Sequence, residues 1–133
     1  MSPAQAKRIL VVDDIEDNLS LLQAILTEEG YEVDITKDGK SALAKIEASP
    51  PDLVLLDAMM PKMNGYEVTR RIRENKKLPF IPILLITAYE DANVSQGLDL
   101  GANDFIRKPI DFDELMARVK ASLRLKDMMN SSQ

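Results

Sequence analysis

Acidic, hydroxyl and amino side chains follow four short apolar runs of this 133-residue sequence. In chain order they are Asp13 and Asp14, Asp57, Thr87 and Lys108. Carboxylates that meet at one place repel one another, and a divalent cation bound through oxygen removes that conflict. Mg²⁺ commonly binds one or two carboxylates together with phosphate oxygens, and Thr and Lys side chains suit the remaining oxygens of a phosphoryl group. A carboxylate can also attack phosphorus, so these residue types predict phosphoryl chemistry, with Asp57 as the acceptor.

The absence of histidine and cysteine narrows the chemistry further. Without cysteine the chain has no disulfide, zinc thiolate site or thiol nucleophile. Without histidine it has no imidazole to act as a base, a phosphoryl carrier or a metal ligand. Any metal must therefore bind to oxygen atoms, which favours Mg²⁺ or Ca²⁺.

The overall charge and hydropathy also exclude some classes of protein. Seventeen Lys and Arg residues stand against 22 Asp and Glu residues, which gives a net charge of −5. An acidic chain is poorly suited to holding a nucleic-acid backbone. No apolar run approaches the roughly 20 residues of a membrane helix, and residues 1–7 lack the apolar stretch of a signal peptide. We expect a cytoplasmic domain with no direct nucleic-acid binding and no membrane insertion.

The spacing of apolar residues predicts the elements that position these side chains. Continuous apolar runs at 9–12, 53–56, 81–86 and 105–106 indicate buried strands, and the alternating segment 31–35 indicates an edge strand. Pro82 cannot donate to a strand ladder, so it is expected at the start of its strand. Because strands alternate with helical patterns, the sequence predicts an α/β fold, with five parallel strands in one open sheet covered by helices on both faces.

Five helices are predicted between and after the strands. Their apolar positions are Ile15, Leu19, Leu22 and Leu26; Leu43 and Ile46; Val68 and Ile72; a weak pattern from Ala92 to Leu100; and Phe112, Leu115, Met116, Val119 and Leu123. Asp38 and Asp111 are expected to cap the second and fifth helices, and Gly30 and Gly101 to end the first and fourth. The predicted organisation is a flexible leader at 1–7, one domain at 8–127 and a frayed polar tail at 128–133.

In open α/β sheets ligands bind beyond the carboxyl ends of the strands, where the five polar residues are expected. Each of them also has a simpler explanation. Asp13 and Asp14 suit a helix cap, Thr87 suits a strand, and Lys108 suits a solvated surface. The prediction depends on four strand ends that carry compatible groups.

The residues also resemble a known family, the receiver domain of bacterial two-component response regulators. The resemblance extends from about Arg8 to Lys126. The segments that carry it are residues 9–14, 51–61, 64–65, 86–88, 101–105 and 108–109. It implies a flavodoxin-like doubly wound fold with sheet order 2-1-3-4-5.

The resemblance also implies roles for individual residues. Asp57 would accept a phosphoryl group from a sensor histidine kinase or a phosphotransfer protein. Asp13, Asp14, Asp57 and the backbone carbonyl of Met59 would hold Mg²⁺. Two further residues would bind the phosphoryl oxygens, Thr87 and Lys108, the latter in a cis Lys-Pro peptide.

The resemblance further implies a conformational switch. Phe105 would turn inward as Thr87 moves toward the phosphoryl group, repacking the face made by the fourth helix, fifth strand and fifth helix for an output partner. From the residues alone, Phe105 would be ordinary core packing. The sequence leaves open whether the chain is a monomer or a phosphorylation-dependent homodimer. Met59 and Tyr89 offer no carboxylate or amide to position a hydrolytic water, which predicts slow autodephosphorylation.

Three other functions compete with this one. A receiver that has lost phosphorylation would act as an interaction domain only. A Mg²⁺-dependent phosphatase of the haloacid dehalogenase type needs a second acid two residues after its nucleophile, where this chain has Met59. A flavin-binding module would need a hydroxyl-rich and glycine-rich loop after the first strand. We expect no enzyme activity on other substrates, only phosphorylation and dephosphorylation at Asp57.

Overall fold

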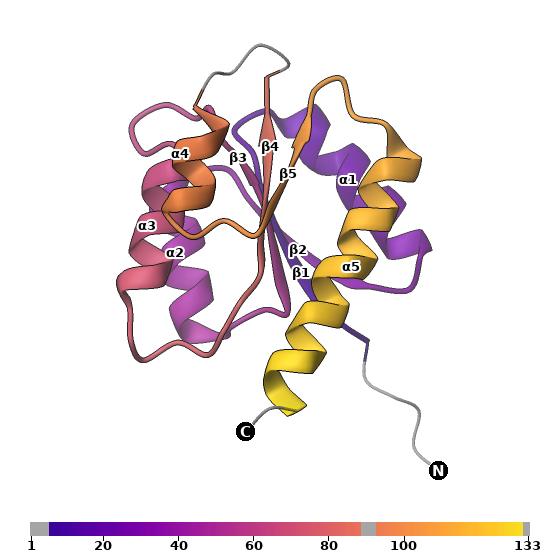
Figure 1. Ribbon diagram of the computed structural model, residues 1–133. Coiled ribbons are helices and arrows are strands. Elements are labelled where there is room, and N and C mark those ends of the chain that lie inside the picture. Colours follow the sequence, from indigo (N-terminus) through magenta and orange to yellow (C-terminus); the bar gives the residue numbers. More distant parts are fainter. Residues whose placement is uncertain (1–5, 89–92, 132–133) are drawn as a thin grey trace.

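Five parallel strands and five helices alternate along the chain in the computed structural model, which describes residues 6–88 and 93–131 (Figure 1). The elements are β1 (Arg8–Val12), α1 (Glu16–Glu28), β2 (Glu32–Thr36), α2 (Gly39–Ala48), β3 (Leu53–Asp57), α3 (Gly65–Glu74), β4 (Ile83–Thr87), α4 (Val94–Asp99), β5 (Asp104–Arg107) and α5 (Phe112–Ser131). The strands form one sheet in the order β2-β1-β3-β4-β5, with every neighbouring pair parallel. The predicted flavodoxin-like fold and strand order are confirmed.

The sheet separates two apolar layers. Alternate strand residues face opposite sides, so Leu10 and Leu56 pack with α2 and α3, whereas Ile9 and Leu55 pack with α1 and α5. Figure 1 shows α2, α3 and α4 on one side of the sheet and α1 and α5 on the other. The central strands β3 and β4 are buried along their whole length, and the edge strand β2 alternates between exposed and half-buried residues. The predicted difference is confirmed for β2, β3 and β4, but β5, predicted as a buried strand, lies at the other edge of the sheet and is half-buried except at Ile106.

The ends of the helices show where local sequence signals succeed and fail. The Asp38 side chain accepts a hydrogen bond from the Ser41 amide, and Asp111 accepts from Glu114, as predicted. Ile15 and Phe112, predicted to lie on buried stripes, are instead 50% and 41% exposed. Ile15 directly precedes α1 and Phe112 is the first residue of α5. Both lie just beyond the carboxyl ends of the strands, so no strand lies beneath them.

The last helix continues past the predicted domain end at residue 127. Residues 128–131, expected as a frayed tail, belong to α5. The Lys126 ammonium donates a 2.6 Å hydrogen bond to the Phe80 carbonyl, and Asp127 pairs with Lys7 at 2.6 Å. These contacts hold the C-terminal half of α5 against the segments that lead into β4 and β1. Lys7 was expected in the flexible leader, but its carbonyl also accepts from the Glu32 amide at 2.9 Å.

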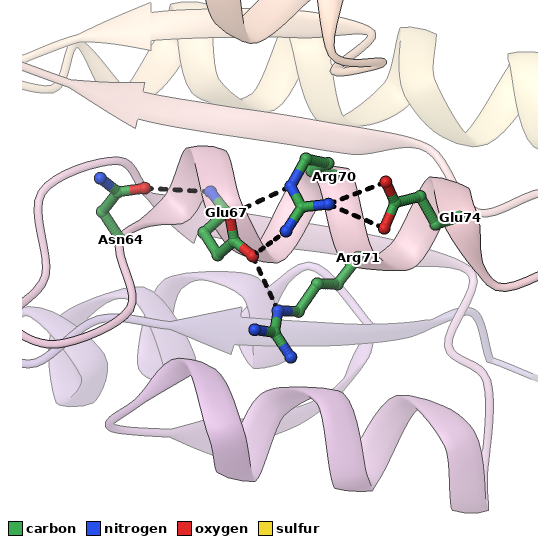
Figure 2. Close-up of polar contacts among 5 residues, drawn as sticks. All are labelled: Asn64, Glu67, Arg70, Arg71 and Glu74. Atoms are coloured by element: carbon green, nitrogen blue, oxygen red, sulfur yellow. Dashed lines mark hydrogen bonds and ion pairs between the residues drawn. The ribbon is translucent and has the colours of Figure 1, made fainter.

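Charged side chains line the solvent face of α3 (Figure 2). Asn64 caps the helix by accepting from the Glu67 amide at 3.0 Å. Glu67 accepts hydrogen bonds from Arg70 and Arg71, and these hold the pKa of its carboxyl well below its usual range, at about 2. Arg70 also pairs with Glu74 at 2.8 Å. Exposed pairs of this kind stabilise a helix only modestly, so α3 depends mainly on its cap and its buried face.

Among the described helices, none is long and apolar enough to cross a bilayer.

Two helices of the same layer begin with glycine after an Asp or Asn cap, and the two glycines differ in what surrounds them. A Cβ at Gly65 would lie 2.5 Å from the backbone oxygen of Asp57 and 2.8 Å from the Ala58 Cα. A Cβ at Gly39 would meet only side-chain atoms, of Val68 and Met63. The start of α3 therefore lies directly against the end of β3, and only glycine allows this approach.

We predict that Gly65→Ala lowers the free energy of unfolding by about 1–3 kcal/mol, because the backbone of β3 has no room to move away. Urea denaturation measures the change. Gly39→Ala is the matched control, since it gains the same helix propensity but meets side-chain atoms of Val68 and Met63 instead of the backbone, so we expect a smaller loss. Equal losses in the two variants would contradict the prediction.

Candidate functional site

The predicted site residues meet at one edge of the sheet. Asp13 directly follows β1, Asp57 and Thr87 are the last residues of β3 and β4, and Lys108 directly follows β5. These four strands are neighbours in the sheet, so their carboxyl ends lie side by side. The structure thus brings the predicted strand-end residues together.

The carboxylates of Asp13, Asp14 and Asp57 form a tight cluster. One oxygen from each lies within 4.8 Å of the others. Asp13 and Asp57 are each only 2% exposed, whereas Asp14 is open to solvent. Like charges this close and this poorly solvated destabilise one another, and hard oxygen donors are what Mg²⁺ prefers. The donor set therefore fits a divalent cation of that kind.

Asp13 is oriented by the start of α1. Its Oδ1 accepts a 2.9 Å hydrogen bond from the Ile15 amide, and its Oδ2 accepts a 3.2 Å bond from the Asn18 amide group. Asp13 therefore shapes the turn that leads into α1, although the cap position itself is Ile15 and not an aspartate. Asn18 contacts the acidic cluster although no sequence signal distinguished it.

The surroundings of Asp57 shift the pKa of its carboxyl in opposite directions. Burial raises the pKa of its carboxyl to about 6, and the neighbouring charges of Asp13 and Asp14 add to the increase. Two contacts act the other way: the Met59 amide donates to Oδ1 at 3.1 Å, and the Lys108 ammonium lies 3.5 Å from the same oxygen. Asp57 is therefore a weakly solvated carboxylate with one cation beside it.

Thr87 and Lys108 are fixed through the backbone of neighbouring strands. The Lys108 amide donates to the Thr87 carbonyl at 2.7 Å, and the Lys108-Pro109 peptide is cis, as the resemblance implied. The Lys108 side chain remains about one-third exposed. Thr87 is fully buried, and its hydroxyl donates to the Ala88 carbonyl at 3.3 Å.

Phe105 lies on the same face of the sheet as Thr87. It is paired in register with Leu85, two residues before Thr87, and its half-buried ring packs on the layer that contains α2 and α3. This placement agrees with core packing and with a role beside Thr87. Met59, two residues after Asp57, is 59% exposed, and Tyr89 lies outside the described residues.

Sequence reasoning missed or underused three residues at this edge. Asn18 contacts Asp13, Gly65 lies against Asp57, and the Arg107 guanidinium lies 5.3 Å from the centre of the Phe105 ring. Gly65 entered the sequence analysis only as part of a segment that carries the family resemblance. Asn18 and Arg107 are polar residues in a helix and a strand, and only the fold shows what they contact.

Comparisons with known proteins agree with this geometry. The family model of the response regulator receiver domain matches residues 9–120. The chain is 49% identical over 120 residues to the response regulator PleD of Caulobacter vibrioides, and 47% identical over 119 residues to PhoP of Bacillus subtilis, an alkaline phosphatase synthesis transcriptional regulatory protein. These matches cover 90% and 89% of this chain but only 26% of PleD and 49% of PhoP, so the chain spans half or less of these relatives.

Solved structures show the same similarity. The receiver domain of a signal transduction histidine kinase from Syntrophus aciditrophicus has a TM-score of 0.83 at 35% identity, over 90% of this chain and 91% of that one. The chemotaxis protein CheY4 of Vibrio cholerae has a TM-score of 0.82 at 28% identity, over 89% of this chain and 99% of that one. The similarity extends across nearly all of the fold described here.

We predict that Asp57→Asn raises the free energy of unfolding at pH 7, without added metal, by about 1–3 kcal/mol. The folded-state pKa of about 6 exceeds the ordinary value of 3.8, so the folded protein binds more protons than the unfolded chain between these values. The contribution of Asp57 to the stability of the wild type must then fall as pH rises from about 4 to 6. Urea denaturation at pH 4 to 7 should show that the free energies of unfolding of the wild type and of Asp57→Asn converge near pH 4.

The control for this prediction is Asp17→Asn, which removes the same charge from an exposed position on α1. It is expected to change stability little at any pH. If Asp57→Asn and Asp17→Asn behaved alike, the charge conflict at Asp57 would be disproved.

Proposed function

The chain belongs to the response regulator receiver domain family of two-component systems, and on that basis we propose that it is a phosphorylation-dependent switch with Asp57 as its phosphoacceptor. One observation carries the proposal. The Asp57 carboxylate is almost fully buried, yet it lies 3.5 Å from the Lys108 ammonium and within a cluster of two other acids. A structural core would not bury an acid beside two more acids, but a phosphoryl-accepting site needs this arrangement.

The proposed reaction is a transfer of one phosphoryl group. An Asp57 carboxylate oxygen attacks phosphorus, a new O–P bond forms, and the bond from phosphorus to the donor's nitrogen breaks. The donor is a phosphohistidine of a sensor histidine kinase or a phosphotransfer protein, since this chain contains no histidine. With acetyl phosphate the leaving group is acetate. Thr87 and Lys108 contact the phosphoryl oxygens and stabilise the charge that develops on them.

A bound Mg²⁺ would supply further positive charge at this site. Asp13, Asp14, Asp57 and the Met59 backbone carbonyl are its proposed ligands, and the 4.8 Å cluster of carboxylate oxygens supports the first three. Asn18 and the Ile15 amide keep both Asp13 oxygens oriented toward the start of α1.

The proposed output is a change of the surface formed by α4, β5 and α5, for a partner that the sequence does not identify. Thr87 leaves the Ala88 carbonyl to contact the phosphoryl group, and Phe105 turns into the space that this opens. Their shared sheet face supports this route. We place this activity in the cytoplasm and propose no reaction on other substrates.

We predict that incubation with acetyl phosphate and Mg²⁺ adds one phosphoryl group to the wild-type chain, measured by intact mass. Asp57→Ala should gain none, and omission of Mg²⁺ should greatly reduce the gain. Asp52→Ala, which keeps the acceptor, is the control. No gain by the wild type would favour an interaction domain without phosphorylation, whereas continuous phosphate release from many phosphate esters would favour a phosphatase.

The phosphoryl group is expected to be long-lived, because Met59 and Tyr89 carry no carboxylate or amide that could position a hydrolytic water. Met59→Asn combined with Tyr89→Glu should shorten the half-life of the aspartyl phosphate several-fold, since general-base positioning of water contributes substantially to hydrolysis. Loss of the phosphorylated mass after removal of acetyl phosphate measures it. An unchanged or longer half-life would refute the prediction.

A further inference from the structure

The Ala88 carbonyl oxygen, directly after β4, accepts two side-chain hydrogen bonds. The Thr87 hydroxyl donates at 3.3 Å, and Nη1 of Arg107 donates at 3.4 Å. Thr87 and Arg107 are also paired in register between β4 and β5. One backbone oxygen therefore connects the buried threonine of the site to a cation on the edge strand.

The same guanidinium contacts the ring of Phe105. Its central carbon lies 5.3 Å from the ring centroid, within the range of a favourable cation–π contact. Phe105 and Arg107 are two residues apart on β5, so their side chains leave the same face of the sheet. Arg107 thus contacts Phe105 directly and Thr87 through Ala88.

We propose that Arg107 is a positioning residue that holds Thr87 and Phe105 in their resting arrangement and so sets the cost of phosphoryl binding. This inference rests on the proposed function. The Thr87 hydroxyl must leave the Ala88 carbonyl to reach a phosphoryl oxygen, and Phe105 must leave the guanidinium to turn inward. Contacts that exist only before the change reduce the population of the rearranged state, and the apparent affinity for a phosphoryl mimic falls in proportion.

Binding of beryllium fluoride with Mg²⁺, followed by amide NMR titration, tests this proposal. Arg107→Gln keeps a hydrogen-bond donor for Ala88 but removes the planar cation from the ring. Because it also removes a charge that attracts anions, the same substitution is made in a Phe105→Leu background, where the charge effect remains and the ring contact is absent. Arg107→Gln should tighten beryllium fluoride binding about two- to fivefold more when Phe105 is present than in the Phe105→Leu background. This factor corresponds to the free energy of an exposed cation–π contact.

A second measurement needs no substitution. The Arg107 side-chain protons lie over the ring and should show upfield ring-current shifts, which should disappear when beryllium fluoride binds. Equal effects of Arg107→Gln in both backgrounds, or ring-current shifts that persist in the bound state, would overturn the inference while leaving the proposed function intact. If the wild type neither bound beryllium fluoride nor gained a phosphoryl group, the proposed function would fail and the inference with it.

Discussion

The confinement of three carboxylates at one sheet edge is the constraint that dominates this molecule. The apolar residues of β1 and β3 bury these strands, and the carboxyl end of β3 carries Asp57 into a nearly dry position beside Asp13. The resulting charge conflict costs folding energy in the isolated chain, and one ammonium, that of Lys108, offsets only part of it. A ligand that brings positive charge or neutralises an acid therefore stabilises the site. The repulsion among the carboxylates, which lowers the free energy of unfolding, is relieved when such a ligand binds, and this relief strengthens the binding.

The surroundings keep the cluster in place despite this repulsion. Gly65 allows the start of α3 to lie against the Asp57 backbone, and the Met59 amide donates to the Asp57 carboxylate. On the other side, Ile15 and Asn18 hold both oxygens of Asp13. These contacts come from backbone groups and short side chains, which lose little conformational entropy when they are fixed. The side chains of the site are therefore held in a fixed arrangement, which suits the phosphoryl transfer proposed above.

The sequence predicted most of this site because strand-end residues require only that the strands be found and be parallel. Asp57 and Thr87 directly follow long apolar runs, and Lys108 follows a short one, so the predicted strands bring all three to the same edge of the sheet. The order of the strands came from the family resemblance, since periodicity alone does not say which strands are neighbours. Exposure at the ends of helices was predicted poorly, because Ile15 continues an apolar pattern into a region where no strand lies beneath it. The contact of Arg107 with Phe105 depends on side-chain geometry that no spacing rule encodes.

The two apolar layers differ in how close they lie to the proposed switch residues. Thr87 and Phe105 both face the layer that contains α2 and α3, while the layer beneath α1 contains neither of them. A substitution among the residues that pack α1 on the sheet, such as Leu22, changes mainly how firmly the sheet is supported. A substitution on the opposite side, such as Leu85 beside Phe105, also changes the surroundings of a proposed switch residue. The packing beside the proposed switch residues and the packing beneath α1 therefore lie on opposite faces of the sheet, and α5 connects them, because it packs with α1 and also forms part of the proposed output surface.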